Sequence, residues 1–150
     1  MRSMGDTQSG FERSFLTELT TAGRRLRTLF DGLVRQRGLT LSRARALLHL
    51  SRCPAINQTE LASLLEVEGP TVVRLLDGME KNGLIERSAI DGDRRAKQIS
   101  LTPAARHQVE GIEKISGEIG RDVLREIDPA ELEIAIRVLR QMIRNMEPAS

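Results

Sequence analysis

Arginine is the residue type in this chain best suited to chemistry at a surface. Residues 24–52 carry eight arginines and one acid, Asp31, a local excess of seven positive charges. A second cluster, Asp93-Arg94-Arg95, follows a turn-forming stretch. Guanidinium groups donate paired hydrogen bonds to phosphates and to guanine edges, so these clusters favour binding of a polyanion. For the first cluster alone, a solvated basic helix face is an equally good explanation.

Residue patterns for catalysis are absent from the sequence. Its two histidines, His49 and His107, are far apart and fall on different predicted helices, and Cys53 is the single cysteine. No nucleophile stands beside a base, no cysteine and histidine cluster could bind a metal, and no glycine-rich phosphate loop is present. We therefore expect neither an enzyme nor a bound metal or cofactor.

The composition favours a mostly α-helical fold. Three Phe and no Trp or Tyr leave Leu, Ile, Val, Ala and Met to build the core, which suits helix packing. Apolar residues spaced alternately by four and three predict a long helix over 11–37, preceded by a disordered tail over 1–10. A second helix should begin with Ser42 as its N-cap and end before Pro54.

The middle of the chain carries two further helix signals. Asn57 and Glu60 form a capping-box pattern before a short third helix. Pro70 opens a fourth helix, which Gly83 ends. The short third helix, the tight turn and the longer fourth helix together predict a helix-turn-helix.

Two strand-like segments, 84–88 and 97–101, flank the turn that holds the second arginine cluster. They predict a β-hairpin with an exposed tip. A helix-turn-helix followed by a hairpin is the plan of a winged helix-turn-helix, which we place at 42–101. The expected fold class is therefore mostly α with a small β-wing.

The fourth helix is the predicted recognition helix. If the apolar residues of this helix, Val72, Leu75, Leu76 and Met79, face the core, helix geometry directs a second set of residues to the opposite surface. That set comprises Pro70, Thr71, Arg74, Gly78 and Lys81. Arg74 could bind a guanine edge, and Thr71 a thymine methyl or a phosphate. For Arg74 alone, a solvated surface arginine is the better explanation.

The hairpin tip strengthens the DNA interpretation. Arg94 and Arg95 at the end of a short lever suit the narrow, strongly negative minor groove, and we expect Arg95 to enter it. Asp93 would orient a wing arginine, although an ordinary exposed ion pair would explain it equally.

The terminal helices predict a homodimer. Thr102-Pro103 and Asp128-Pro129 are N-cap signals that open two further helices, with 11–37 and 102–146 as the dimerisation segments. Their apolar stripes exceed what the 42–101 lobe can cover, so a partner must bury them, an intramolecular bundle being the alternative. The predicted interface residues are Phe15, Leu19, Leu132, Ile136, Leu139 and Ile143. Such a dimer presents two recognition helices about 34 Å apart, which suits pseudo-palindromic double-stranded DNA.

The stretch 74–87, the Asp93-Arg94-Arg95 wing and the Leu101-Thr102 pair resemble the MarR family, in particular its SlyA-like branch. The resemblance implies a single MarR-type domain over 11–150 and a dimeric transcriptional regulator, often a repressor. It also implies roles for Arg95 in the minor groove, for Asp93 as its orienter, and for Arg74 and Thr71 in the recognition helix.

The resemblance further implies relief of DNA binding by a small aromatic or phenolic acid. Arg45 and His49, one turn apart on the second helix, are the candidate ligand residues, although a structural role suits His49 better. Peroxide-sensing members carry their reactive cysteine near the N-terminus, so we expect Cys53 to be a partly buried, inert thiol.

Two expectations concern partners and location. A helical interaction dimer without DNA contact is the rival function, and it would leave Arg74 and the wing arginines without a role. No apolar run approaches the roughly 20 residues that span a bilayer, so we expect a cytoplasmic protein without membrane contact.

Overall fold

The computed structural model describes residues 4–90 and 92–148, which form two compact units, one ending at Ser116 and the other beginning at Gly117. The elements are α1 (Met4–Arg35), α2 (Leu41–Arg52), α3 (Gln58–Leu65), α4 (Gly69–Lys81), β1 (Ile85–Ile90), β2 (Asp93–Leu101), α5 (Pro103–Val123) and α6 (Pro129–Met146). This arrangement confirms the predicted mostly helical fold with a small two-stranded sheet.

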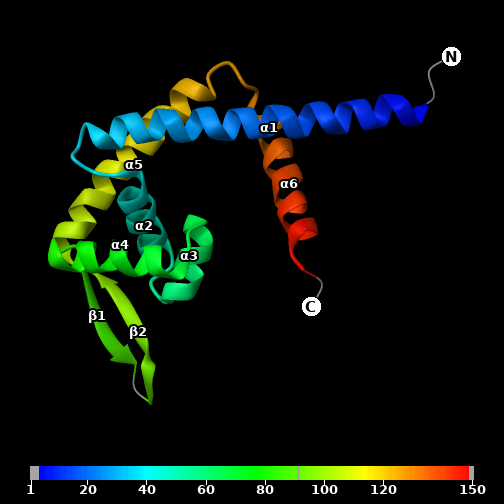
Figure 1. The fold of residues 1–150 in the computed structure, drawn as a ribbon. Helices are drawn as coiled ribbons and strands as arrows, with labels where there is room; N and C mark the ends of the chain where they lie inside the picture. Colours follow the sequence, from blue (N-terminus) through cyan, green and yellow to red (C-terminus); the bar gives the residue numbers. More distant parts are fainter. Residues whose placement is uncertain (1–3, 91, 149–150) are drawn as a thin grey trace. The chain divides into compact units, whose positions relative to one another are not determined.

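The core of the first unit lies among α2, α3, α4 and the base of the hairpin (Figure 1). Helix α2 contacts α1, α3, α4 and β2, while α4 also contacts α3 and β1. The largest fully buried side chains are aliphatic, as the composition predicts: Val34, Leu47, Leu61, Val72, Leu76, Met79, Ile85 and Ile112. Helix α4 is thus held on one side by α2 and α3 and on another by β1.

The first two helices begin earlier than predicted. Helix α1 starts at Met4, so residues 4–10, expected as a disordered tail, are helical, while residues 1–3 lie outside the described ranges. Adding residues to an existing helix costs far less than nucleating one, and no proline interrupts this stretch. The N-cap of α2 is Thr40 rather than Ser42, since its Oγ1 accepts a hydrogen bond from Arg43 N at 3.3 Å.

The predicted caps of α3 and α4 are present. Asn57 Oδ1 accepts from Glu60 N at 2.8 Å, and Glu60 Oε2 accepts from Asn57 N at 3.1 Å, which completes the capping box. Gly83 follows α4 with a φ of 71°, a left-handed conformation that glycine adopts without steric cost. Local sequence signals therefore set both ends of the helix-turn-helix.

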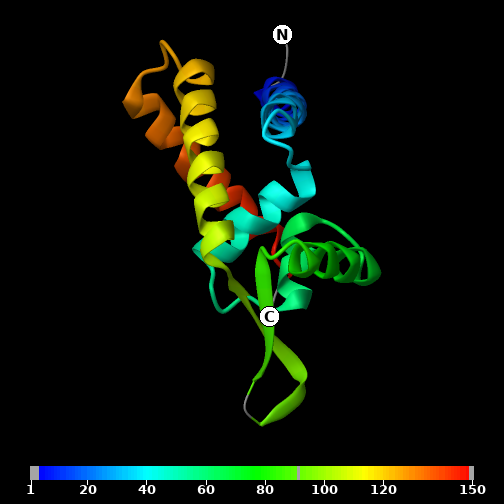
Figure 2. The same cartoon turned by 90° about the vertical axis from the view of Figure 1, so that its left-hand side faces the viewer.

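The hairpin is longer than predicted and antiparallel, with Ile85 opposite Leu101 and Arg87 opposite Ile99. Its register shifts between Ala89 and Ile90. Figures 1 and 2 show the hairpin extending beyond α4, on the side away from α1. Glycine at position 92, with a φ of 90°, provides the turn that local propensity predicted.

Helix α5 begins as predicted, with Thr102 as its N-cap. Thr102 Oγ1 accepts from Ala105 N at 3.2 Å and donates to Gly83 O at 2.6 Å, so one hydroxyl joins the start of α5 to the turn after α4. In the second unit, Asp128 caps α6 by accepting from Ala130 N at 2.8 Å. Across residues 4–90 and 92–148, no helix is long and apolar enough to cross a membrane.

Candidate nucleic-acid interface

The outer face of α4 carries the polar side chains that the helix period predicted. Thr71, Arg74 and Lys81 are exposed together with Pro70, whereas Val72, Leu76 and Met79 of the same helix are buried. Glu68, the N-cap, makes no side-chain hydrogen bond to the helix, and no acid lies in the first turn. The N-terminal end of α4 is therefore open to an anion.

Gly78 does not lie on this outer face, where the helix period had placed it. It is half-buried, and a Cβ built on it would lie 3.3 Å from Arg43 Nη2 of α2. The missing side chain admits the Arg43 guanidinium between α2 and α4. Gly78 thus lies at the contact between α4 and α2.

Arg87 is the charged residue that sequence reasoning missed. It projects from β1 and pairs with Asp77 and Glu80 on the last turns of α4. Hydrogen bonds from Glu80 first and Asp77 second raise the pKa of the Arg87 guanidinium above its usual value. The signal was available in the strand alternation, because Arg87 shares the inward face of β1 with buried Ile85.

The wing predictions lie outside the described residues. The backbone of β2 begins at Asp93, but the side chains of Asp93, Arg94 and Arg95 fall in the stretch that is not described. Their assignment to the minor groove therefore stays a prediction. The hairpin that would carry them is present, with its tip in the loop between Ile90 and Asp93.

Arg45 and His49 have structural surroundings. Arg45 Nη2 donates to the backbone O of Leu64 at 3.1 Å, which ties α2 to the last turn of α3. Burial first, and then the positive charges of Arg45 and Arg52, lower the pKa of His49 below its usual value. Neither residue lines the two cavities described next, so their role in ligand binding stays a prediction.

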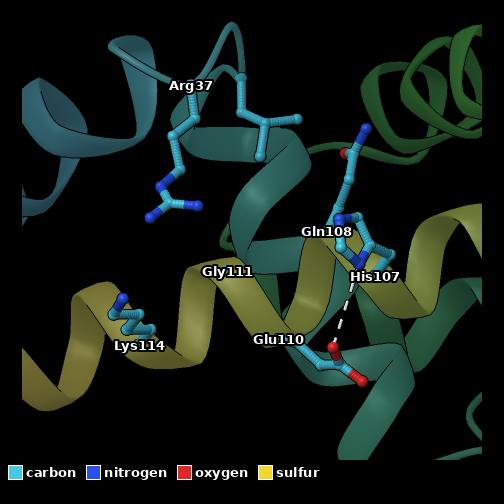
Figure 3. Close-up of a pocket in the computed structure, with 7 residues that line it drawn as sticks. Arg37, His107, Gln108, Glu110, Gly111 and Lys114 are labelled. Carbon is cyan, nitrogen blue, oxygen red and sulfur yellow. Dashed lines mark ion pairs between the residues drawn. The ribbon is translucent and has the colours of Figure 1, made fainter.

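A hollow of about 520 Å³ opens between the α1–α2 connection and α5. Figure 3 shows Arg37 reaching down from that connection toward Gly111 of α5, with Lys114 beside it. Leu39 is buried at the same site, and His107 Nδ1 lies 4.0 Å from Glu110 Oε2. A smaller cavity of about 350 Å³ lies between the end of α2, β2 and the start of α5.

Gly111 determines where the Arg37 guanidinium can lie. A Cβ on Gly111 would come within 2.7 Å of Arg37 Nη1, a distance that real contacts do not reach. Within the described ranges, neither Arg37 nor Lys114 forms an ion pair. The lining of the hollow therefore holds two cations, Arg37 and Lys114, one carboxylate, Glu110, and the apolar side chain of Leu39.

The predicted dimer residues have exposed surface in the single chain. In the first unit Phe15 is exposed and Leu19 is half-buried. In the second unit no residue of α6 is buried, and one face of the helix carries an apolar stripe, with Ile134 and Val138 exposed outside it. That stripe holds Leu132, Ile136, Leu139, Ile143 and Met146.

Cys53 departs from the prediction in one respect. It is exposed at the C-terminal end of α2 rather than partly buried, because the helix ends there and the chain turns away through Pro54. In the part of the chain that the structure describes, no group of histidine, cysteine and acidic residues could hold a metal ion.

These features, a winged helix-turn-helix with an open cationic recognition face, define a nucleic-acid-binding regulator by class. The model of the MarR family matches residues 39–97, from the start of α2 into β2. The crystal structure of transcriptional regulator PA3341 is 41% identical over 90% of this chain and 99% of that chain, with a TM-score of 0.82. The chain belongs to the MarR family. Because this family consists of transcriptional regulators, the expectation that the protein is not an enzyme is confirmed.

Two similar structures contain DNA. The Staphylococcus aureus MepR–DNA complex is 25% identical over 90% of this chain and 98% of that chain, with a TM-score of 0.72. A MarR-family regulator from Listeria monocytogenes, complexed with a 26mer DNA, is 19% identical over 87% of each chain, with a TM-score of 0.79. At that identity the second likeness concerns the fold alone.

Proposed function

We propose that the protein is a homodimeric repressor of the SlyA-like branch that binds a pseudo-palindromic DNA operator and releases it when a small aromatic or phenolic acid binds. The observation that carries the proposal is the outer face of α4, where Thr71, Arg74 and Lys81 are exposed on a helix packed from two sides. The DNA complexes of MepR and of the Listeria regulator support the same use of the fold.

The geometry of α4 favours direct contact with base edges. Arg74 and Thr71 lie in its first two turns, close to an N-terminus that attracts phosphate. A recognition helix seated by its N-terminal turns brings these side chains to the floor of the major groove. Arg74 would donate a bidentate pair to guanine, and Lys81, at the other end of α4, would bind a phosphate.

The terminal helices support the homodimer. An isolated 18-residue amphipathic helix with no buried residue gains almost no tertiary stabilisation, so α6 needs a partner for its stripe. A second copy of the chain supplies an identical stripe and satisfies twofold symmetry. The same symmetry presents two α4 helices to the two halves of a pseudo-palindrome.

Selection of bound sequences from a random DNA pool tests the proposal, followed by fluorescence anisotropy on the enriched duplex. Arg74→Ala should weaken binding to that duplex by about 1–3 kcal/mol, the worth of one bidentate base contact. Arg24→Ala is the matched control, because α1 lies on the far side of α2 from α4 in both views. A dimer that enriches no sequence would support the rival interaction protein instead.

The acid that releases DNA would bind in the hollow beside α5. Arg37 and Lys114 outnumber the Glu110 carboxylate in the lining and so suit a bound carboxylate, while Leu39 suits the ring that bears it. A bound acid there would contact both the α1–α2 connection and α5, and a change in their spacing would shift α2, against which α4 packs.

Benzoate and 2-hydroxybenzoate are suitable probes, with benzyl alcohol as the uncharged control. Gly111→Ala should abolish their effect on DNA binding, because its methyl group displaces the Arg37 guanidinium. Gly117→Ala is matched to it, since that Cβ would meet its nearest neighbour, Arg121 Nη1, at an ordinary 3.7 Å in the same helix. Equal probe responses in the two variants would contradict this placement.

A further inference from the structure

Arg87 occupies an unusual place for a cation in this fold. It is the third residue of β1, opposite Ile99 of β2, and on the same inward face as Ile85. Ile85 and Ile99 are both buried. The Arg87 side chain therefore leaves the hairpin toward α4, and it is only 15% exposed.

Two carboxylates of α4 pair with different nitrogen atoms of this guanidinium. Arg87 Nε pairs with Glu80 Oε2, and Arg87 Nη2 pairs with Asp77 Oδ1. Asp77 and Glu80 are three residues apart, so they stand on adjacent turns of one helix face. A planar guanidinium that is held through two of its nitrogens fixes both its own orientation and the part of α4 that carries its partners.

The two acids also present an electrostatic problem that Arg87 reduces. Asp77 and Glu80 remain 56% and 46% exposed, on a helix whose outer face is assigned to DNA. Unpaired carboxylates there would repel phosphates. Asp77 lies one turn beyond Arg74 along α4. The orientation of the Asp77 side chain therefore affects how much room the Arg74 side chain has to reach a base.

We propose, resting on the DNA-binding function above, that Arg87 is a positioning residue that locks α4 to the hairpin and thereby sets the sequence preference of Arg74. It does so without touching a base or a phosphate. The recognition helix and the wing then approach DNA as one body, and the register of base contacts follows from the hairpin as well as from α4.

Three variants separate this role from its alternatives. Arg87→Met keeps the length of the side chain and removes both ion pairs. Arg87→Lys keeps the charge and offers one contact in place of two. Arg87→Met combined with Asp77→Asn and Glu80→Gln removes the unpaired acids while leaving α4 unlocked. Arg27→Met is the matched control, because the Arg27–Glu66 pair, at 3.0 Å, joins α1 to the end of α3.

Binding is measured on the selected duplex and on a scrambled duplex across a salt series. Arg87→Met should lose about tenfold or more on the selected duplex, the scale of one misplaced base contact, and less on the scrambled one. The slope of affinity against salt should stay at the wild-type value, because no phosphate contact is lost. The triple variant should regain affinity for the scrambled duplex without regaining preference for the selected one. Arg27→Met should match the wild type on both duplexes.

Three results would overturn the proposal. If Arg87→Met lost the same affinity for both duplexes, and its affinity depended less on salt by about one released ion, Arg87 would be a phosphate contact. Full preference in the triple variant would reduce its role to charge neutralisation. Unchanged preference in folded Arg87→Met would remove the role altogether, and Arg87→Lys decides the matter if Arg87→Met does not fold.

Amide hydrogen exchange keeps this inference separate from the proposed function. Arg87→Met should accelerate exchange in the last turns of α4 relative to Arg27→Met, with or without DNA. If the wild type shows no sequence preference, the proposed function fails. Unchanged protection of α4 in Arg87→Met would then overturn the locking role as well, whereas faster exchange would support it.

Discussion

Replacing Leu139 and Ile143 of α6 together with glutamate should break the homodimer. Both residues lie on the apolar stripe of a helix that has no buried residue in the single chain, and Ile143 is 56% exposed. Fully burying an Ile or Leu side chain is worth about 1.5–3 kcal/mol. Since about half of Ile143 remains to be buried, it contributes roughly 1 kcal/mol, and half-buried Leu139 rather less.

Twofold symmetry doubles these contributions. Loss of both side chains from both copies should remove about 3 kcal/mol, which weakens dimerisation by roughly a hundredfold. Four carboxylates placed in an apolar seam add a desolvation penalty of several kcal/mol unless they shift outward. The double variant should therefore be monomeric or aggregated at concentrations where the wild type is a dimer.

Sedimentation velocity over a dilution series measures this change, with circular dichroism to verify the helix content. Arg137→Glu with Arg144→Glu is the control, because these positions face away from the stripe and introduce the same side chains. A dimer of unchanged mass and affinity in the Leu139/Ile143 variant would refute the assignment of α6 to the interface. A monomeric wild type would refute the whole assembly argument.

Three further substitutions test local features of the fold. Thr102→Val should lower the free energy of unfolding in urea by about 1–3 kcal/mol, because it removes the hydroxyl shared by Gly83 O and Ala105 N, whereas Thr102→Ser should retain most of it. Cys53→Ser should leave DNA binding and its response to peroxide unchanged, because Cys53 ends α2 instead of lying at an activating helix N-terminus. Folding lowers the pKa of His49, so its contribution to the free energy of unfolding is complete above pH 6.5 and declines as the pH falls below 6.5 toward the folded-state pKa. His49→Gln should therefore make stability depend less on pH in this acid range. Thermal unfolding at several pH values measures this change.

Local signals predicted the parts of the fold that local chemistry controls. The capping box of Asn57 and Glu60 and the left-handed Gly83 depend on neighbours in sequence, and the structure has both. The sequence predicted Ser42 as the N-cap of α2, whereas the structure has Thr40 in that position. Only the extended backbone at Thr40 selects it.

The contacts between helices and strands could not be predicted from local sequence signals. The position of Gly78 on the helix wheel was compatible with the outer face, and it is the packing of Arg43 from α2 that directs it inward. The partners of Arg87 also depend on tertiary packing. Its inward position followed from strand alternation, but its partners on α4 depended on how the hairpin folds back, which no period in the sequence specifies.

The arginine-rich stretch 24–52 shows why charge density along a sequence predicts a binding surface poorly. Arg27 pairs with an acid of α3, Arg43 packs against α4 at Gly78, and Arg45 donates to a carbonyl at the end of α3. Arg37 lies over α5 beside a separate hollow. These four guanidiniums lie against neighbouring elements of the first unit, so their density along the sequence is not evidence for a second DNA-binding surface.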